Sequence, residues 1–158
     1  MKTNKDNKGF SLVELIIVIA IMAVLVGVLA PAYLRYVEKS RKAADIQAID
    51  SVMSAMEVAA IDPMLNMADG DVMKVKLTNT SPTVATSFIG AQDVMDELFA
   101  TIGAYQLKSK DWKKIIIQGT VSGGQVIFKY SDEAPAGKGL KDSAPDMNIT
   151  EDDNVTFN

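Results

Sequence analysis

An uninterrupted apolar run near the start of the chain constrains its fold more than any other feature. From Leu15 to Leu34 there are twenty residues without a charge. At 1.5 Å per residue, a helix of that length spans about 30 Å, the thickness of the hydrocarbon core of a bilayer. The run therefore predicts a membrane-spanning helix.

A single carboxylate, Glu14, stands at the head of this run. A charge inside a membrane helix costs about 2.5 to 3.5 kcal/mol on insertion scales, so we expect Glu14 to have a partner and a function. The next cation is Arg35, about four to six helical turns along the chain. Cleavage between Gly9 and Phe10 would supply a closer one. The new α-amino group is cationic, and another copy of the chain could bring it beside Glu14.

The sequence Lys8-Gly9-Phe10-Ser11-Leu12-Val13-Glu14-Leu15 resembles the prepilin signature of type IV pilins and their relatives. With the helix that follows, the resemblance covers roughly the first third of the chain. It implies that a membrane peptidase cuts after Gly9 and methylates the new N-terminal Phe10. It also implies that Glu14 helps each incoming subunit to dock.

Two residues of the apolar run, Gly27 and Pro31, are expected to mark a kink or a locally melted stretch. A proline removes one helical hydrogen bond and clashes with the preceding turn. Many family members carry a proline at the position of Pro31, whereas a second family proline would fall at Ser51 and is absent. We expect melting only once neighbouring helices surround the stretch, because unpaired backbone groups are costly in lipid.

Two other interpretations of the N-terminus remain open. It could be a secretory signal peptide cut at Ala30-Pro31-Ala32, although the apolar core is too long and Glu14 fits poorly. It could also be a plain membrane anchor with an incidental charge. Lys and Arg flank the run on both sides, so counting them does not orient it. The cytoplasmic placement of the N-terminus rests on the resemblance.

Composition narrows the function of the remaining chain. It has no His and no Cys, which removes the commonest general base, the commonest transition-metal ligand and any disulfide. Without a leader of residues 1–9, thirteen basic and nineteen acidic residues leave a formal charge of −6. An acidic chain is a poor partner for nucleic acid. We therefore expect no enzyme activity, no cofactor and no nucleic-acid partner.

The helical period continues past the apolar run to about Ile61, where Pro63 ends it. Apolar residues at three- and four-residue steps predict one buried face, formed by Tyr33, Tyr36, Val37, Ala44, Ile49, Val52, Met53, Met56 and Ala60. Arg41 and Asp45 stand four apart and are expected to pair on the solvent face. The helix is thus predicted to be apolar throughout its first half and amphipathic in its second.

Strand signals follow this helix. The clearest is a hairpin of 112–121 and 125–130 around Ser122-Gly123-Gly124. The sequence also predicts a weaker strand at 72–78, a short helix at 91–102, a loop at 131–146 and short strands at 148–150 and 155–158. The last segments must be held by strand pairing, apolar contacts or an ion, because no disulfide is available. The prediction is an α+β fold.

Acidic loop motifs and three Asn-x-Ser/Thr motifs receive weaker interpretations. Asp69-Gly70-Asp71 and Glu151-Asp152-Asp153 are expected to be solvated loop acids and not a Ca²⁺ site, so no metal is predicted. Sequons at Asn79, Asn148 and Asn154 occur often by chance.

The resemblance implies a pilin with a leader at 1–9, a transmembrane and filament-core helix at 10–34, and a globular head at 35–158. In that arrangement the apolar half of the helix protrudes, and the amphipathic half packs on a small antiparallel sheet. The precursor would cross the cytoplasmic membrane once and then join a helical homo-oligomeric filament outside the cell, where it would support adhesion, motility or biofilm formation. Its partners would be the prepilin peptidase, an assembly platform and a motor. The alternatives are a pseudopilin of a type II secretion system and a membrane-anchored binding domain.

Overall fold

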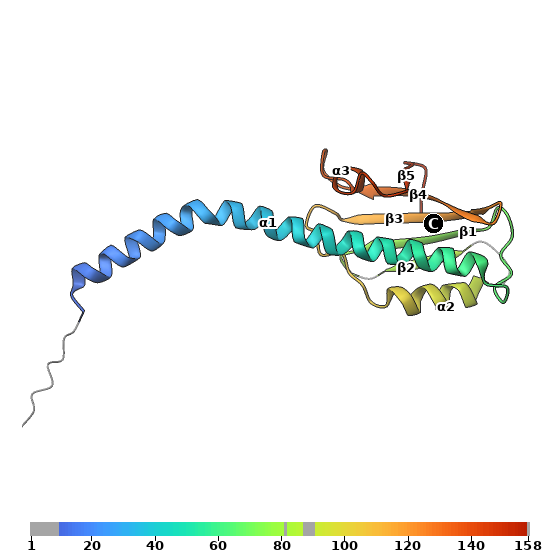
Figure 1. Ribbon diagram of the computed structural model, residues 1–158, viewed down its shortest axis with the longest axis horizontal. Helices are drawn as coiled ribbons and strands as arrows, with labels where there is room; N and C mark the ends of the chain where they lie inside the picture. Colours follow the sequence, from blue (N-terminus) through green and yellow to red (C-terminus); the bar gives the residue numbers. More distant parts are fainter. Residues whose placement is uncertain (1–9, 81, 87–90, 158) are drawn as a thin grey trace, which may run out of the picture. The chain divides into compact units, whose positions relative to one another are not determined.

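A computed structural model describes residues 10–157 except 81 and 87–90 (Figure 1). Its elements in chain order are α1 (Leu12–Ile61), β1 (Val72–Thr78), β2 (Thr83–Thr86), α2 (Ala91–Ile102), β3 (Lys114–Ser122), β4 (Gln125–Glu133), α3 (Leu140–Ser143) and β5 (Thr150–Glu151). The chain divides into two units, Met1–Lys39 and Ser40–Asn158, and α1 contributes to both. The predicted α+β fold is confirmed.

In the first unit, α1 is helical without interruption through Gly27 and Pro31. In the second unit, its remaining turns lie across one sheet with the strand order β2-β1-β3-β4-β5 (Figure 1). Neighbouring strands are antiparallel except β4 and β5, which are parallel.

One face of the sheet and one face of α1 form the main core. On β1, the side chains of Met73, Val75 and Leu77 are buried, and they alternate with half-buried polar neighbours. This period of two places one row of side chains against the helix. The α1 residues in this core are Ile49, Val52, Ala55, Met56 and Ala59, and the β3 and β4 residues include Ile115, Ile117, Phe128 and Tyr130. The predicted amphipathic half of the helix therefore buries one face as expected, but Tyr33 and Tyr36 of the predicted stripe are exposed.

Gly119 lets α1 approach the middle of the sheet. It pairs with Met73 on one side and Phe128 on the other. A Cβ atom at this position would lie 2.9 Å from Cγ1 of Val126 and 3.1 Å from Sδ of Met56. Real Cβ atoms are essentially never found at the first of these distances, so a side chain at residue 119 would force Val126 and Met56 to shift.

The C-terminal tail covers part of the opposite face of the sheet. Lys74 Nζ donates to the carbonyl oxygen of Thr156 at 2.9 Å, and Lys76 Nζ lies 4.6 Å from the centroid of the Phe157 ring. Val75 lies between these two lysines in β1 and faces α1, so the lysine side chains point to the opposite face of the sheet. The tail therefore crosses the face that α1 does not cover. Val155 is buried beneath it.

The bounds of several elements differ between the structure and the prediction. The hairpin is confirmed, but its strands run to Ser122 and Glu133. The strand at 72–78 and the helix at 91–102 are confirmed. The predicted loop 131–146 contains the end of β4 and the short helix α3, and β2 was not predicted. The predicted strand at 155–158 is wrong for its described part, 155–157, because the tail is held by contacts with lysine side chains and not by a ladder.

Replacement of Gly119 by valine should destabilise the second unit by about 1 to 3 kcal/mol, because the added methyl groups overpack the contact with Val126 and Met56. Thermal unfolding of the chain in detergent, followed by circular dichroism, measures this. Ser122→Ala, at the exposed end of the same strand, is the matched control and should change stability by less than about 0.5 kcal/mol. Equal melting temperatures for the two variants would show that the contact at Gly119 is not tight.

Candidate assembly site

Glu14 lies in the first turn of α1 and bonds to the start of its own helix. Its Oε2 accepts a hydrogen bond from the backbone N–H of Ser11, with 2.8 Å between the atoms. A carboxylate at this position that bonds the N-cap N–H is one half of a capping box. Reasoning from the charge alone misses this bond, although the Ser-x-x-Glu spacing of Ser11 and Glu14 indicates it. The described part of the chain gives the carboxylate a donor but no cation.

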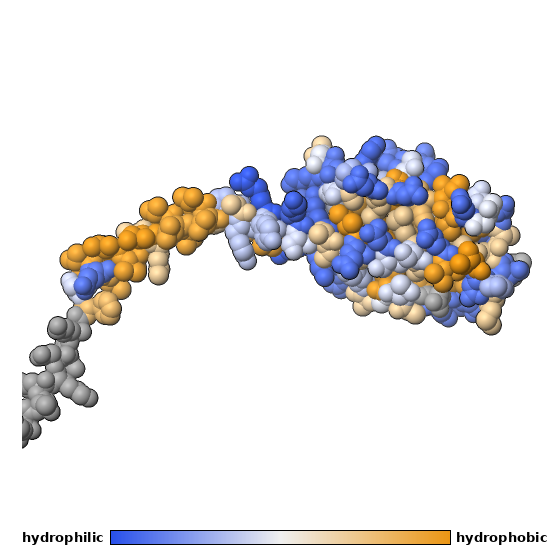
Figure 2. All heavy atoms as spheres, in the orientation of Figure 1, coloured by the Kyte–Doolittle hydropathy of each residue, from blue (hydrophilic) through white to orange (hydrophobic). Residues whose placement is uncertain are grey.

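The apolar half of α1 is uncovered in the single chain. Figure 2 shows this segment as an apolar surface interrupted near its start by hydrophilic atoms. Large side chains along it are exposed on every side, and Val28, for example, is 72% exposed. The helix is long and apolar enough to cross a membrane, and none of the qualifying stretch is buried. A core helix of a soluble protein would be buried, so this surface requires lipid or other protein chains.

The structure places the other predicted site residues as follows. Phe10 precedes the helix and is 91% exposed. Gly9 lies outside the described residues, so the predicted cleavage junction is described on one side only. Gly27 and Pro31 lie within the helix, and the carbonyl oxygen of Pro31 accepts a hydrogen bond from Arg35 Nε at 3.4 Å.

A polar network in the second unit ties the C-terminal loop to α1. Lys42 Nζ lies 3.1 Å from Oδ2 of Asp111 and donates to the carbonyl oxygen of Lys138 at 2.9 Å. Lys138 Nζ lies 3.0 Å from the other oxygen of Asp111. The indole Nε1 of Trp112 also donates to the Lys138 carbonyl, at 2.8 Å. Three segments far apart in sequence, namely α1, the segment before β3 and the loop after β4, thus meet at the Asp111 carboxylate and the Lys138 carbonyl.

This network holds the C-terminal loop against α1, a function that a disulfide can have in a chain with cysteines. The side chains of Lys42 and Asp111 are only 14% and 17% exposed. Burial alone would raise the pKa of Asp111, but hydrogen bonds from Lys138 and Lys42 outweigh it and hold the pKa below 3.8. The loop is therefore held by charged hydrogen bonds in addition to the predicted strand pairing and apolar contacts.

A second buried carboxylate, Asp45, fixes the segment between α2 and β3. It is fully buried and accepts hydrogen bonds from the Tyr105 hydroxyl at 2.6 Å and from the backbone N–H groups of Lys108 and Ser109 at 2.8 and 2.7 Å. Burial, followed by the bond to the carboxylate, raises the pKa of Tyr105. The prediction that Asp45 lies on the solvent face is therefore wrong, because Asp45 points into the domain and not away from it.

The acidic loop motifs bond to protein groups. Asp69 accepts from the N–H of Gly123 at 2.9 Å, and Asp71 accepts from the N–H of Ala68 at 2.7 Å. Asp152 lies 2.9 Å from Lys129 Nζ, and this bond, together with hydrogen bonds from Asn154, lowers the pKa of Asp152 to about 2. Among the described residues, no group of three or more His, Cys, Asp or Glu side chains could hold a metal ion.

Comparison with known proteins assigns the family. Residues 4–30 match the profile of the prokaryotic N-terminal methylation motif. The chain is similar to the fimbrial protein of Dichelobacter nodosus, with 30% identity over 132 residues that cover 83% of this chain and 71% of that protein. The chain belongs to the type IV pilin family. As a pilin it is a structural subunit of a type IV pilus, which is an extracellular filament.

Two further relatives agree with this assignment. Fimbrial protein EcpC of Eikenella corrodens is 27% identical over 130 residues, covering 82% of the pilin and 85% of the relative. Fimbrial protein Q of Moraxella bovis is 32% identical over 98 residues, covering 60% and 62% of the two chains. The pilin thus spans less than two thirds of this last relative. No solved structure matches the pilin. The relatives are fimbrial proteins, which suggests a structural and not an enzymatic role.

The Asp111 network should make the stability of the pilin sensitive to acid. A carboxyl whose pKa is lowered by folding contributes stability above its unfolded pKa of about 4, and this contribution is lost as the pH falls. We expect Asp111→Asn to lower stability by about 1 to 3 kcal/mol at pH 7. The loss of stability between pH 5 and pH 3 should be smaller in this variant than in the unaltered pilin.

Thermal unfolding in detergent at several pH values tests this expectation. Asp153→Asn, an exposed acid without an ion pair among the described residues, is the control and should follow the unaltered curve. Curves for Asp111→Asn and the unaltered pilin that stay parallel from pH 7 to pH 3 would contradict the role given to Asp111.

Proposed function

We propose that residues 1–9 are a leader removed between Gly9 and Phe10, and that Phe10 is then N-methylated by the same peptidase. Residues 10–34 hold the precursor in the cytoplasmic membrane and later form the filament core, while residues 35–158 form the head. Two observations support this: the matched profile spans the junction at residues 4–30, and the helix that follows is apolar, long enough to span a membrane and unburied.

The hydrophobic effect alone does not explain why subunits leave the membrane for the filament. Lipid tails already cover the apolar half of α1, and moving it into a bundle of like helices exchanges one apolar environment for another. The selective force must then come from packing and from polar groups. Glu14 is the one charged side chain between Phe10 and Leu34, so it is the group whose surroundings differ most between lipid and bundle.

The observation that carries the proposal is the geometry of the Glu14 carboxylate. Its Oε2 is bound to the Ser11 N–H, and no bond to Oε1 is found among the described residues. A second oxygen is thus left to accept a bond from the Phe10 ammonium of a neighbouring pilin while the helix keeps its cap. A charge-assisted bond of this kind is about twice as strong as a neutral one, and it offsets the cost of an unpaired carboxylate in a dry core.

In this proposal the head is displayed outside the cell, and the assembly platform and motor act on the membrane-held pilin. The filament then supports adhesion, motility or biofilm formation. Gly27 and Pro31 provide a stretch of α1 that can kink or open once neighbouring helices surround it, since Pro31 leaves one helical carbonyl without its usual donor.

Three substitutions at Glu14 separate the capping bond from the charge. Glu14→Leu and Glu14→Ala remove both, whereas Glu14→Gln keeps an oxygen for the Ser11 N–H but cannot neutralise an ammonium. All three variants should insert into the membrane, and mass spectrometry should show cleavage before Phe10. Sheared filament per processed subunit should fall at least about tenfold in all three, because a lost charge pair of about 1.4 kcal/mol or more changes an equilibrium tenfold.

Gly9→Val serves as the control for processing and should accumulate as an uncut membrane-bound chain. Filament from Glu14→Gln at the unaltered level would show that the cap and not the charge matters. Filament from Glu14→Leu at that level would remove any assembly role for Glu14. A processed chain that begins at Ala32 would refute the leader assignment.

A further inference from the structure

One end of the second unit carries acids and no bases. Glu57 and Asp62 lie at the end of α1, and Asp69 and Asp71 lie in the turns before β1. These turns meet the β3–β4 turn, because Gly70 N–H donates to the Val121 carbonyl at 2.9 Å. No Lys or Arg occurs between residues 43 and 73, nor between 115 and 128. This acidic end therefore contains four carboxylates and no compensating cation.

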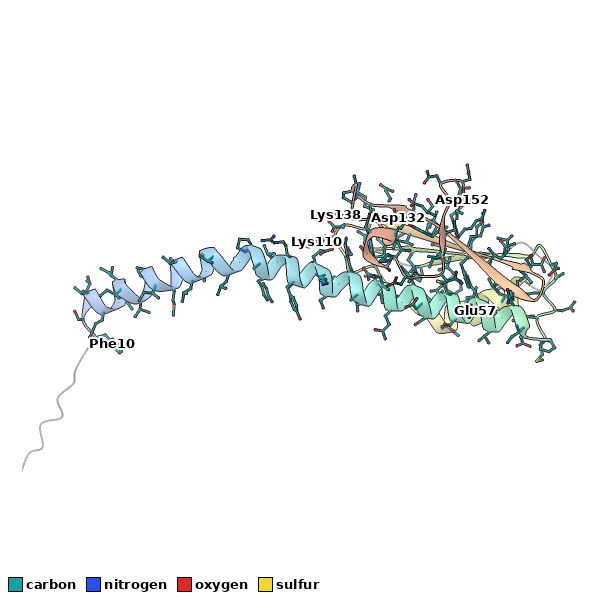
Figure 3. All side chains as sticks on the ribbon, turned by 45° about the horizontal axis from the view of Figure 1, so that its top comes forward. Phe10, Glu57, Lys110, Asp132, Lys138 and Asp152 are labelled. Atoms are coloured by element: carbon teal, nitrogen blue, oxygen red, sulfur yellow. The ribbon has the colours of Figure 1, made fainter. Side chains whose placement is uncertain are left out.

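The other end of the same unit is basic. It is formed by the first turns of α1 in this unit, the segment before β3 and the loop after β4, which the Asp111 network joins. Residues 40–45, 105–114 and 131–142 hold eight Lys or Arg and five Asp or Glu, a balance of +3. One of the five acids, Asp45, is buried. Lys110 and Lys138 are labelled at this end in Figure 3, and Glu57 is labelled toward the other.

Two cations at the basic end extend to the surface. Lys108 and Lys141 are both exposed. Lys108 Nζ lies 5.4 Å from the centroid of the Tyr105 ring, and neither lysine forms an ion pair within the described residues. Their charges are therefore available to another molecule.

The acidic end contains a hollow that suits a lysine side chain. Its volume is about 340 Å³, and it is lined by Glu57, Ile61, Gly124, Gln125, Val126 and Asn148. Ile61 is 71% exposed at the rim, and no cation of the described chain reaches Glu57. The aliphatic part of a lysine side chain packs on apolar surface while its ammonium pairs with a carboxylate. In this hollow, Ile61 offers the apolar surface and Glu57 offers the carboxylate.

We infer that the acidic end of one pilin docks against the basic end of the next pilin in the filament, with the hollow at Glu57 and Ile61 receiving Lys108 or Lys141 of that second copy. The inference rests on the proposed function, because it requires copies that assemble with one polarity. Copies joined head to tail bring opposite ends of the same domain together, and here those ends have opposite charge. At physiological salt, charges act over about 8 Å, so the attraction selects close contacts between these ends and opposes contacts between like ends.

Charge reversal tests this contact in the full-length chain. Glu57→Lys reverses the charge at the hollow, and Lys108→Glu with Lys141→Glu reverses the two cations. Each change alone should reduce sheared filament per processed subunit by about fivefold or more, because like charges would then meet. The triple variant restores opposite charges and should return filament to within about twofold of the unaltered level. Asp153→Lys, an exposed acid outside both ends, is the control and should assemble normally.

The amount of processed subunit, measured by immunoblot, normalises each variant for folding and membrane insertion. Rescue in the triple variant supports a contact between two copies. Losses without rescue would mean that the ends meet another partner, such as the assembly machinery, and would overturn the inference. Unchanged filament from Glu57→Lys would overturn it and leave the proposed function intact. Absence of filament from the unaltered chain would instead refute the proposed function.

Discussion

The uncovered apolar half of α1 is the constraint on which the rest of the pilin depends. Its large side chains are exposed in the single chain, so it is stable only in lipid or among other helices. Since these two environments are similar in polarity, the helix can pass from one to the other at little hydrophobic cost. Lipid and a helix bundle differ in the partners that they offer to polar groups. In our proposal, the carboxylate of Glu14, together with the N-terminus beside it, is therefore the group that determines whether the helix stays in lipid or joins a filament.

The second half of α1 has a different role, because one of its faces is buried in the core of the second unit. Ile49, Val52 and Met56 form one face of the core, and Gly119 allows the sheet to come close to it. Asp45 and the Asp111 network then fix the two long connections that have no strand pairing of their own. In a chain without cysteine, buried carboxylates that accept several hydrogen bonds give these connections one conformation.

Much of this architecture can be predicted from the sequence. The uncharged run, the period of the amphipathic half and the hairpin at Gly123 and Gly124 specify the helix and the central strands, because each is a local pattern with a physical cause. The cap at Ser11 and Glu14 is also local, and it is overlooked only when the charge is considered alone. Asp45 and the Asp111 network cannot be predicted in this way. The partners of Asp45 lie 60 to 64 residues away, and Asp111 bonds to Lys138, 27 residues away, and to Lys42 in α1, so no local pattern indicates them. In the sequence both acids appear as ordinary surface charges.

The central claim is that copies of the pilin replace lipid around the apolar half of α1. The chain has no cysteine, so a single cysteine at Ala20 reports on this surface without interference. A hydrophilic maleimide should not label that cysteine in intact sheared filaments, and labelling should appear after detergent separates the subunits. A cysteine at Asp153 should be labelled in both states. Labelling of the Ala20 cysteine in intact filaments as fast as that of the Asp153 cysteine would contradict the account.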